Sequence, residues 1–337
     1  MKINRSAGAF RSLKEAKRYW VLLTVFVVLG LLAAYGLLVY QNPVPITSPS
    51  FLPVIKRRTV ALIAMLIAAI CQSLSTVAFQ STTGNRIITP SLLGFEALYT
   101  TIHTSTMFFF GAGVFVSLSG SVESFLLQII VMIVMSLILY GWLLSGKYGN
   151  LQLMLLVGII MGTGLKSISS FMRRLLDPSA FDVLQAQLFG SVSHADASYL
   201  PIAIPLVLIA AILLFAFSNK LNVLALGKNA CTSLGINFQR NVIYSLILVS
   251  ILMSVSTALV GPLTFFGFLV AMITYQLAPT YDHRYLFLMA LAIGFLVLTG
   301  SYFFMYHVFR AQGVVSVIIE MFGGVAFLLI LLKKGSL

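Results

Sequence analysis

Ten apolar stretches follow one another along the chain, separated by short segments that are polar or contain glycine and proline. An α-helix needs about 20 predominantly apolar residues to cross a hydrocarbon core about 30 Å thick. The pattern therefore predicts membrane spans at residues 20–40, 59–79, 91–110, 123–144, 151–172, 199–217, 241–260, 263–278, 285–306 and 314–332. Because helices satisfy their own backbone in lipid, we expect an all-α membrane protein: a cytoplasmic basic tail at 1–19, then a single transmembrane domain at 20–334.

Two of the ten predicted spans are irregular. The third contains Glu96 and His103 and is followed by Gly111 and further glycines, a pattern typical of a bent helix or a short re-entrant segment. The eighth span is short and directly follows Gly261-Pro262, so we expect it to abut the seventh.

Composition excludes soluble enzymes and nucleic-acid-binding domains. Apolar residues make up 60% of the chain and charged residues only 9%, whereas about 25% of the residues in soluble domains are charged. The sequence carries no H-E-x-x-H, no G-x-S-x-G and no Cys/His cluster, and the near match to a nucleotide-binding loop before Tyr148 lacks the required Ser or Thr. We therefore expect neither an enzyme nor a bound cofactor or metal, and any ATP chemistry must reside in another chain.

The chain has a net charge of +13, and the positions of its Lys and Arg residues indicate how it is oriented in the membrane. With the N-terminus inside, two thirds of the 21 Lys and Arg residues fall in inside segments, which favours both termini in the cytoplasm. Some cations remain outside, notably Lys56, Arg57, Arg58 and Arg310. They predict either contact with lipid headgroups or a docking surface for an acidic partner.

The most informative polar segment is the loop at about 219–240. Leu-Gly occurs in it at Leu226-Gly227 and again at Leu234-Gly235, with Ala230 midway. Because glycine readily adopts the left-handed conformation that ends a helix, this spacing predicts one short helix capped at both ends. Such a helix is suited to contact a soluble partner or to lie on the lipid headgroups.

Few ionisable residues lie within the spans. Lys166 precedes the outer end of the fifth span by six residues, and Glu320 follows the outer end of the tenth by six. At a rise of 1.5 Å per residue, both lie about 9 Å below the same surface. Their equal depth predicts a pair, acting as a latch that opens in transport, as a static ion pair, or as two residues facing a water-filled path.

The loop with its two Leu-Gly pairs resembles the ATPase-coupling loop of FecCD-like permeases, the membrane subunits of ABC importers for iron-siderophore complexes, haem and cobalamin. Four further segments resemble the same family, at residues 58–61, 89–94, 261–267 and 323–327. Pro90 to Phe95 and Thr280 to Tyr285 are most similar to the iron-siderophore branch. Two positions depart from the family pattern: Ile55 stands where relatives often have a second arginine, and His307 stands where relatives have an external arginine, with Arg310 one turn on.

The resemblance implies the type II ABC importer permease fold and a division of labour among subunits. Leu226, Gly227, Ala230, Leu234 and Gly235 would dock on an ATPase, and Lys56, Arg57, Arg58 and Arg310 on an extracellular binding protein. Ser145 and Gly146 would lie near the cytoplasmic gate, with Lys166 and Glu320 on the path. The partners implied are a second permease and two ATPases that use ATP and Mg. The alternatives are an ion-coupled secondary transporter, or the same ABC class carrying haem or cobalamin.

Overall fold

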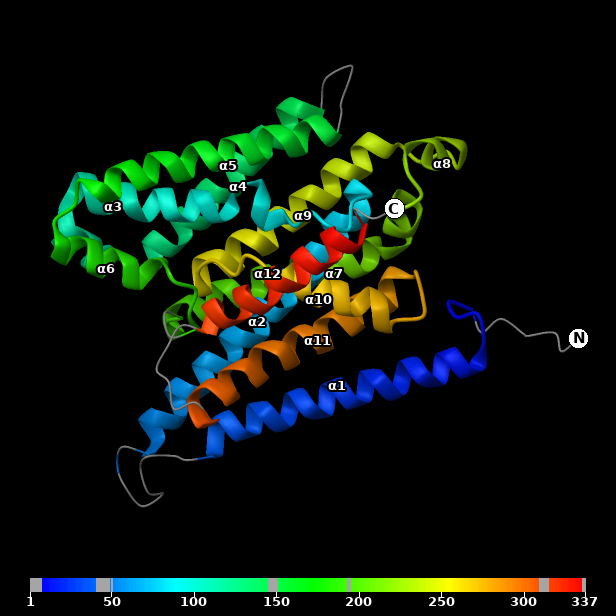
Figure 1. The fold of residues 1–337 in the computed structure, drawn as a ribbon, viewed down its shortest axis with the longest axis horizontal. Coiled ribbons are helices and arrows are strands. Elements are labelled where there is room, and N and C mark those ends of the chain that lie inside the picture. Colours follow the sequence, from blue (N-terminus) through cyan, green and yellow to red (C-terminus); the bar gives the residue numbers. More distant parts are fainter. Residues whose placement is uncertain are drawn as a thin grey trace, which may run out of the picture.

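The computed structural model describes residues 8–40, 49, 51–144, 151–192, 195–308 and 315–334, and within them the chain is helical (Figure 1). The helices are α1 (Leu13–Val39), α2 (Phe51–Thr83), η1 (Pro90–Leu93), α3 (Phe95–Leu118), α4 (Val122–Leu144), α5 (Leu151–Arg174), α6 (Pro178–Leu188), η3 (Ala197–Tyr199), α7 (Leu200–Leu224), α8 (Lys228–Ser233), α9 (Phe238–Val260), α10 (Phe266–Leu277), α11 (His283–Phe303), η4 (Phe304–Val308) and α12 (Val315–Lys334).

Each of the ten predicted spans corresponds to one of these helices, which confirms the predicted fold class. In the described part of the chain, 8 helices are long and apolar enough to cross a membrane, and α10 and α12 supply shorter apolar stretches. The third span bends as predicted, because Gly111 in α3 has a φ of 79° and interrupts the helix. Helix α6 was not predicted; at 11 residues it is too short to span, and its Leu184 and Leu188 pack beneath α3.

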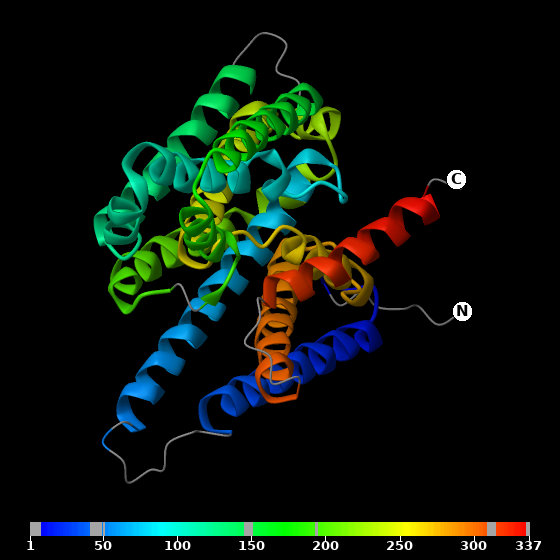
Figure 2. The ribbon, with the colours of Figure 1, turned by 60° about the vertical axis from the view of Figure 1, so that its left-hand side comes forward.

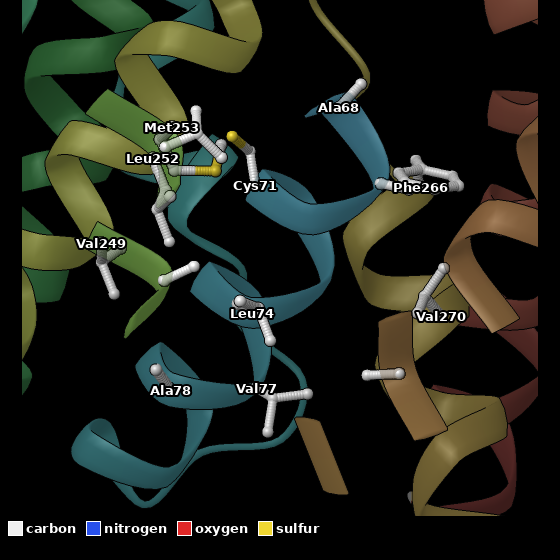
Figure 3. Packing of buried hydrophobic residues seen from close by; sticks show 14 of the residues in the cluster. Ala68, Cys71, Leu74, Val77, Ala78, Val249, Leu252, Met253, Phe266 and Val270 are labelled. Carbon is white, nitrogen blue, oxygen red and sulfur yellow. The ribbon is translucent and has the colours of Figure 1, made fainter. Parts of the chain in front are cut away.

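Helices α2 and α9 form the centre of the bundle. Of the apolar stretch in each helix, 67% is buried in α2 and 72% in α9, against 17% in α1 at the periphery. Figure 3 shows Cys71 of α2 facing Leu252 and Met253 of α9, with Phe266 of α10 on the other side of α2.

Small and hydroxyl-bearing residues let the neighbouring helices approach α2 closely. Thr82 of α2 lies 2.8 Å from the hydroxyl of Ser245 in α9, and Gln72 Nε2 donates to Ser256 Oγ at 3.3 Å. A Cβ added at Gly267 of α10 would overlap the hydroxyl of Thr76 and lie 3.3 Å from the backbone oxygen of Gln72. Helix association in lipid depends on such close packing and on polar contacts between helices, since burial of apolar surface supplies no drive there.

The two ends of the bundle differ. The start of α1, the end of α12 and helix α8 lie at one end, and α6 lies at the other (Figure 1). At the α8 end, Phe10 is buried against the rings of Tyr19 and Tyr285, and Thr280 Oγ1 donates to the Ala9 carbonyl at 2.8 Å. In Figure 2, the second half of α12 diverges from the other helices, and its side chains that are described there are exposed.

The close approach of α10 to α2 yields a stability prediction. We expect Gly267→Ala to destabilise the purified protein by about 1–3 kcal/mol, the usual cost of overpacking a core, and to lower its melting temperature in detergent by several degrees. The matched control is Gly300→Ala in α11, where a Cβ meets nothing within 4 Å. Equal melting temperatures for the two variants would contradict the close packing.

Candidate functional site

Helix α8 is a short, firmly anchored projection at one end of the bundle. It lies between Gly227 (φ 90°) and Gly235 (φ 71°), as the two Leu-Gly pairs predict. Leu226 and Leu234, which precede these glycines, are 67% and 61% exposed. Ala230 is half-buried between them. The short helix thus presents an exposed leucine at each of its ends.

A buried thiol holds α8 against the bundle. The side chain of Cys231 is fully buried, and its Sγ donates to the backbone oxygen of Val223 in α7 at 3.3 Å. Burial raises the pKa of this thiol, so the group stays protonated and keeps its hydrogen at neutral pH. The thiol contact and the glycine caps thus hold α8 against the end of α7.

A polar cavity of about 580 Å³ opens beside α8. Its lining includes Arg11, Arg86, Tyr281, Leu226 and the polar groups of a buried network. In that network the ring of His283 bonds to Ser81 of α2 on one side and to Asn222 of α7 on the other. The network joins three spanning helices at the end of the bundle that carries α8.

Apart from α8 and the cavity beside it, the break between α9 and α10 is the other region of interest. Residues 261–265 are not helical, and Gly261 (φ 79°) allows the sharp turn. The break is enclosed by other segments: Ser191 N donates to the Val260 carbonyl at 2.7 Å, and a Cβ at Gly323 of α12 would lie 2.6 Å from Cβ of Phe265. Non-helical backbone at membrane depth is tolerated only where protein surrounds it or water fills a cavity, and broken helices often mark transport sites.

Two carboxylates meet at this break. Thr264 Oγ1 donates to Glu96 Oε2 at 2.7 Å and lies 3.4 Å from Glu320 Oε1. Glu96 is in the first turn of α3, where the helix dipole favours a negative charge, and only 5% of it is exposed. Glu320, in α12, is half-buried. Three segments far apart in the sequence therefore converge on one threonine hydroxyl.

Lys166 is the cation of this neighbourhood. Gly94 lies so close to Gly162 that a Cβ on Gly162 would be 3.2 Å from the Gly94 Cα, and this contact places α5 against the start of α3. Lys166, one turn beyond Gly162, acts electrostatically on both Glu96 and Glu320. It is exposed and, among the described residues, forms an ion pair with neither carboxylate. Thr264, rather than Lys166, is in direct contact with Glu320, and the Lys166–Glu320 pair stays a prediction.

The sequence did not single out Glu96 or Thr264 as site residues. Glu96 was noted only as an irregularity of the third span, and Thr264 only as one letter of a Gly-Pro motif. The available signal was that a carboxylate within a spanning helix is costly in lipid and usually faces a partner or a path. Which partner it faces depends on the tertiary contact between α3 and the α9–α10 break.

The predicted docking cations lie at the start of α2. Lys56 and Arg57 are exposed. Arg58 instead donates to carbonyls at the end of α1, to Leu38 O at 2.9 Å and to Leu37 O at 3.1 Å, and so caps that helix. Arg310 and the predicted gate residues Ser145 and Gly146 lie outside the described residues.

Comparison with known proteins identifies the family. The model of the FecCD transport family matches residues 19–333. The chain belongs to the FecCD transport family. This result confirms the resemblance found in the sequence, and the protein is a multi-pass permease subunit of the ABC importer class.

Curated relatives of this FecCD member include permeases of three bacteria. It is 68% identical to the petrobactin import system permease protein FatC of Bacillus anthracis, over 99% of this chain and 94% of FatC. It is 37% identical to the petrobactin import system permease protein YclO of Bacillus subtilis, over 83% of this chain and 89% of YclO. Identity to the ferric enterobactin permease FepD of Escherichia coli is 29%, over 66% and 65% of the two chains.

A solved structure shows the same fold. A metal-chelate type ABC transporter in an inward-facing conformation superposes with a TM-score of 0.78 at 18% sequence identity, covering 92% of this chain and 98% of the other. At that identity the likeness establishes the arrangement of helices. The fold is therefore that of an ABC importer permease, as predicted.

Proposed function

We propose that this FecCD permease is the membrane-spanning subunit of an ATP-driven importer that carries an iron-siderophore complex across the cell membrane. The observation that carries the proposal is the 68% identity to a petrobactin import permease over nearly its whole length. A second petrobactin permease, YclO, is also more similar to this chain than the enterobactin permease is. Petrobactin is accordingly the siderophore we propose.

The proposed transporter contains two different permeases. Bacillus anthracis has both FatC and FatD as petrobactin import permeases, and this chain is 68% identical to FatC but 23% identical to FatD. A FatD-like protein is thus the proposed second permease. Two ATPases holding ATP and Mg would complete the membrane complex, and an extracellular binding protein would deliver the chelate. Both termini and α8 would then face the cytoplasm.

The uptake of petrobactin tests the proposal directly. The permease, a FatD-like partner, the ATPase and the binding protein would be expressed together in cells that lack their own siderophore permeases. We expect ATP-dependent uptake of radiolabelled iron as ferric petrobactin, and a much lower rate with ferric enterobactin. Ferric enterobactin uptake equal to that of ferric petrobactin would contradict the proposed substrate, and uptake of neither chelate would contradict the function.

A second prediction concerns coupling to the ATPase through Leu226, Gly227, Ala230, Leu234 and Gly235. Proline at position 230 disfavours the helical conformation of Asn229, the residue before it, and so distorts this single-turn helix. We expect Ala230→Pro to reduce transport and substrate-stimulated ATP hydrolysis by at least tenfold while the helical bundle stays folded. The control is Thr232→Ala, which removes an exposed hydroxyl from the same helix. Wild-type transport by Ala230→Pro would show that α8 is only a linker.

A third prediction separates the cations proposed to dock the binding protein. Lys56 and Arg57 are exposed, and we expect Arg57→Glu to slow association with an acidic surface, an effect that salt screens. Arg58→Glu should also destabilise the permease, because it removes the cap of α1. The matched control is Lys14→Glu, an exposed cation at the opposite end of α1. Binding kinetics of the assembled transporter would show equal on-rates for Arg57→Glu and wild type if Arg57 serves only lipid contact.

A further inference from the structure

A groove between α7 and α9 lies at the end of the bundle that carries α8. It holds a cavity of about 770 Å³, lined by residues 213–220 of α7 and by residues 237–247 at the start of α9. The two helices pack against each other and are joined by the segment that contains α8 (Figure 1). The groove shares no lining residue with the polar cavity around His283, so it is a separate place on the chain.

The lining of this groove changes from basic to apolar with distance from α8. Lys220 lies near the end of α7 and Arg240 near the start of α9, about 6 Å and about 3 Å from those ends at 1.5 Å per residue. Leu213 and Ile247 lie about 14–17 Å from the same helix ends. Because α7 runs toward α8 and α9 runs away from it, the two cations share one end of the groove and the two aliphatic side chains share the other.

The two cations line the groove without an acidic partner in it. Lys220 and Arg240 are both exposed. Lys220 Nζ lies 5.6 Å from the centre of the Phe217 ring, which packs against the Tyr244 ring with 4.9 Å between ring centres. The face of an aromatic ring attracts an ammonium group, so this contact holds Lys220 beside the groove. The lining residues that the structure describes include no Asp or Glu, and two positive charges at one end of a groove attract an anion.

The surroundings of the groove indicate that this anion belongs to a lipid. The apolar end of the groove continues into an exposed aliphatic face of α7, a helix apolar enough to cross a membrane: Leu208, Ile209, Ile212 and Leu213. Tyr244, 38% exposed, lies between that end and the cations, and tyrosine is enriched where headgroups meet acyl chains. A free phosphate ion would leave the apolar half of the groove uncovered, whereas a glycerophospholipid carries its phosphate and its acyl chains in this order.

We propose that Lys220 and Arg240 bind the phosphate of an anionic phospholipid in the membrane leaflet at the α8 end, with an acyl chain lying in the groove past Tyr244 toward Leu213. Basic pockets between spanning helices are suited to such headgroups. Phosphatidylglycerol, with its net negative charge, satisfies the two cations, whereas a choline headgroup brings a positive charge next to them and binds less well. The bound lipid bridges the ends of the two helices that flank α8. This site does not depend on the transported chelate.

The test uses photoactivatable phospholipids that react with the protein from the middle of an acyl chain. Full-length permease is placed in otherwise identical nanodiscs that contain either a phosphatidylglycerol probe or a phosphatidylcholine probe with the same chains. Crosslinked peptides are identified and quantified by mass spectrometry. The proteins compared are wild type, Lys220→Gln combined with Arg240→Gln, and Lys14→Gln, a control that removes an exposed cation at the start of α1.

We expect the phosphatidylglycerol probe to crosslink at least fivefold more than the phosphatidylcholine probe to the peptides that contain residues 208–216 and 244–247. The double glutamine variant should lower the phosphatidylglycerol signal there about tenfold and leave the signal on α1 within about twofold of wild type. Lys14→Gln should leave the groove signal unchanged. Lys220→Arg combined with Arg240→Lys keeps both charges and should retain most of the signal, which separates a loss of charge from a defect in folding.

Three results on the full-length permease would overturn the inference: no crosslinks in the groove, equal crosslinking by the two probes, or an unchanged groove signal in the double glutamine variant. The measurement is repeated on the assembled transporter. Loss of the groove crosslinks there would assign Lys220 and Arg240 to contact with a partner protein, whereas their retention supports the lipid site. Because the measurement requires no transport, a failure to take up ferric petrobactin would reject the proposed function and leave this site standing.

Discussion

The requirement that every backbone polar group find its partner inside the protein governs this structure, because hydrocarbon offers no hydrogen bonds. A bundle of unbroken helices meets this requirement segment by segment. The break at 261–265 and the turn before α3 do not, and both lie against other parts of the chain. The segment around Ser191 and helix α12 enclose the break, and α5 lies against the turn before α3. The irregular segments can thus expose Thr264 and Glu96 to one another without exposing backbone to lipid.

A feature of this fold could be predicted from the sequence when the residues that determine it are close together along the chain. The ten spans could be predicted because hydropathy is a local property, and helix α8 because two Leu-Gly pairs determine its caps within a few residues. The bend at Gly111 and the break after Gly261 were predicted for the same reason. Helix α6 was missed because it is too short to span and its apolar residues face α3.

The candidate site could be predicted only in part, because it depends on distant contacts. Equal depth placed Lys166 and Glu320 in one neighbourhood, but depth does not reveal which helices are adjacent. The contact of Thr264 with Glu96 joins residues 168 positions apart, and no local pattern reports it. Arg58 illustrates the same limit: no local pattern reports that its guanidinium caps a helix that ends about 20 residues earlier, and its docking role stays a prediction.

The attachment of α8 to α7 has a mechanical consequence. A loop between two helices ordinarily absorbs a displacement by bending, so that motion at its tip is lost before it reaches the membrane. Here the buried Cys231 thiol and the two glycine caps join α8 to the end of α7, and α9 begins only a few residues beyond. Helix α8 is therefore tied directly to two packed helices, one of which runs through the centre of the bundle to the break at Gly261.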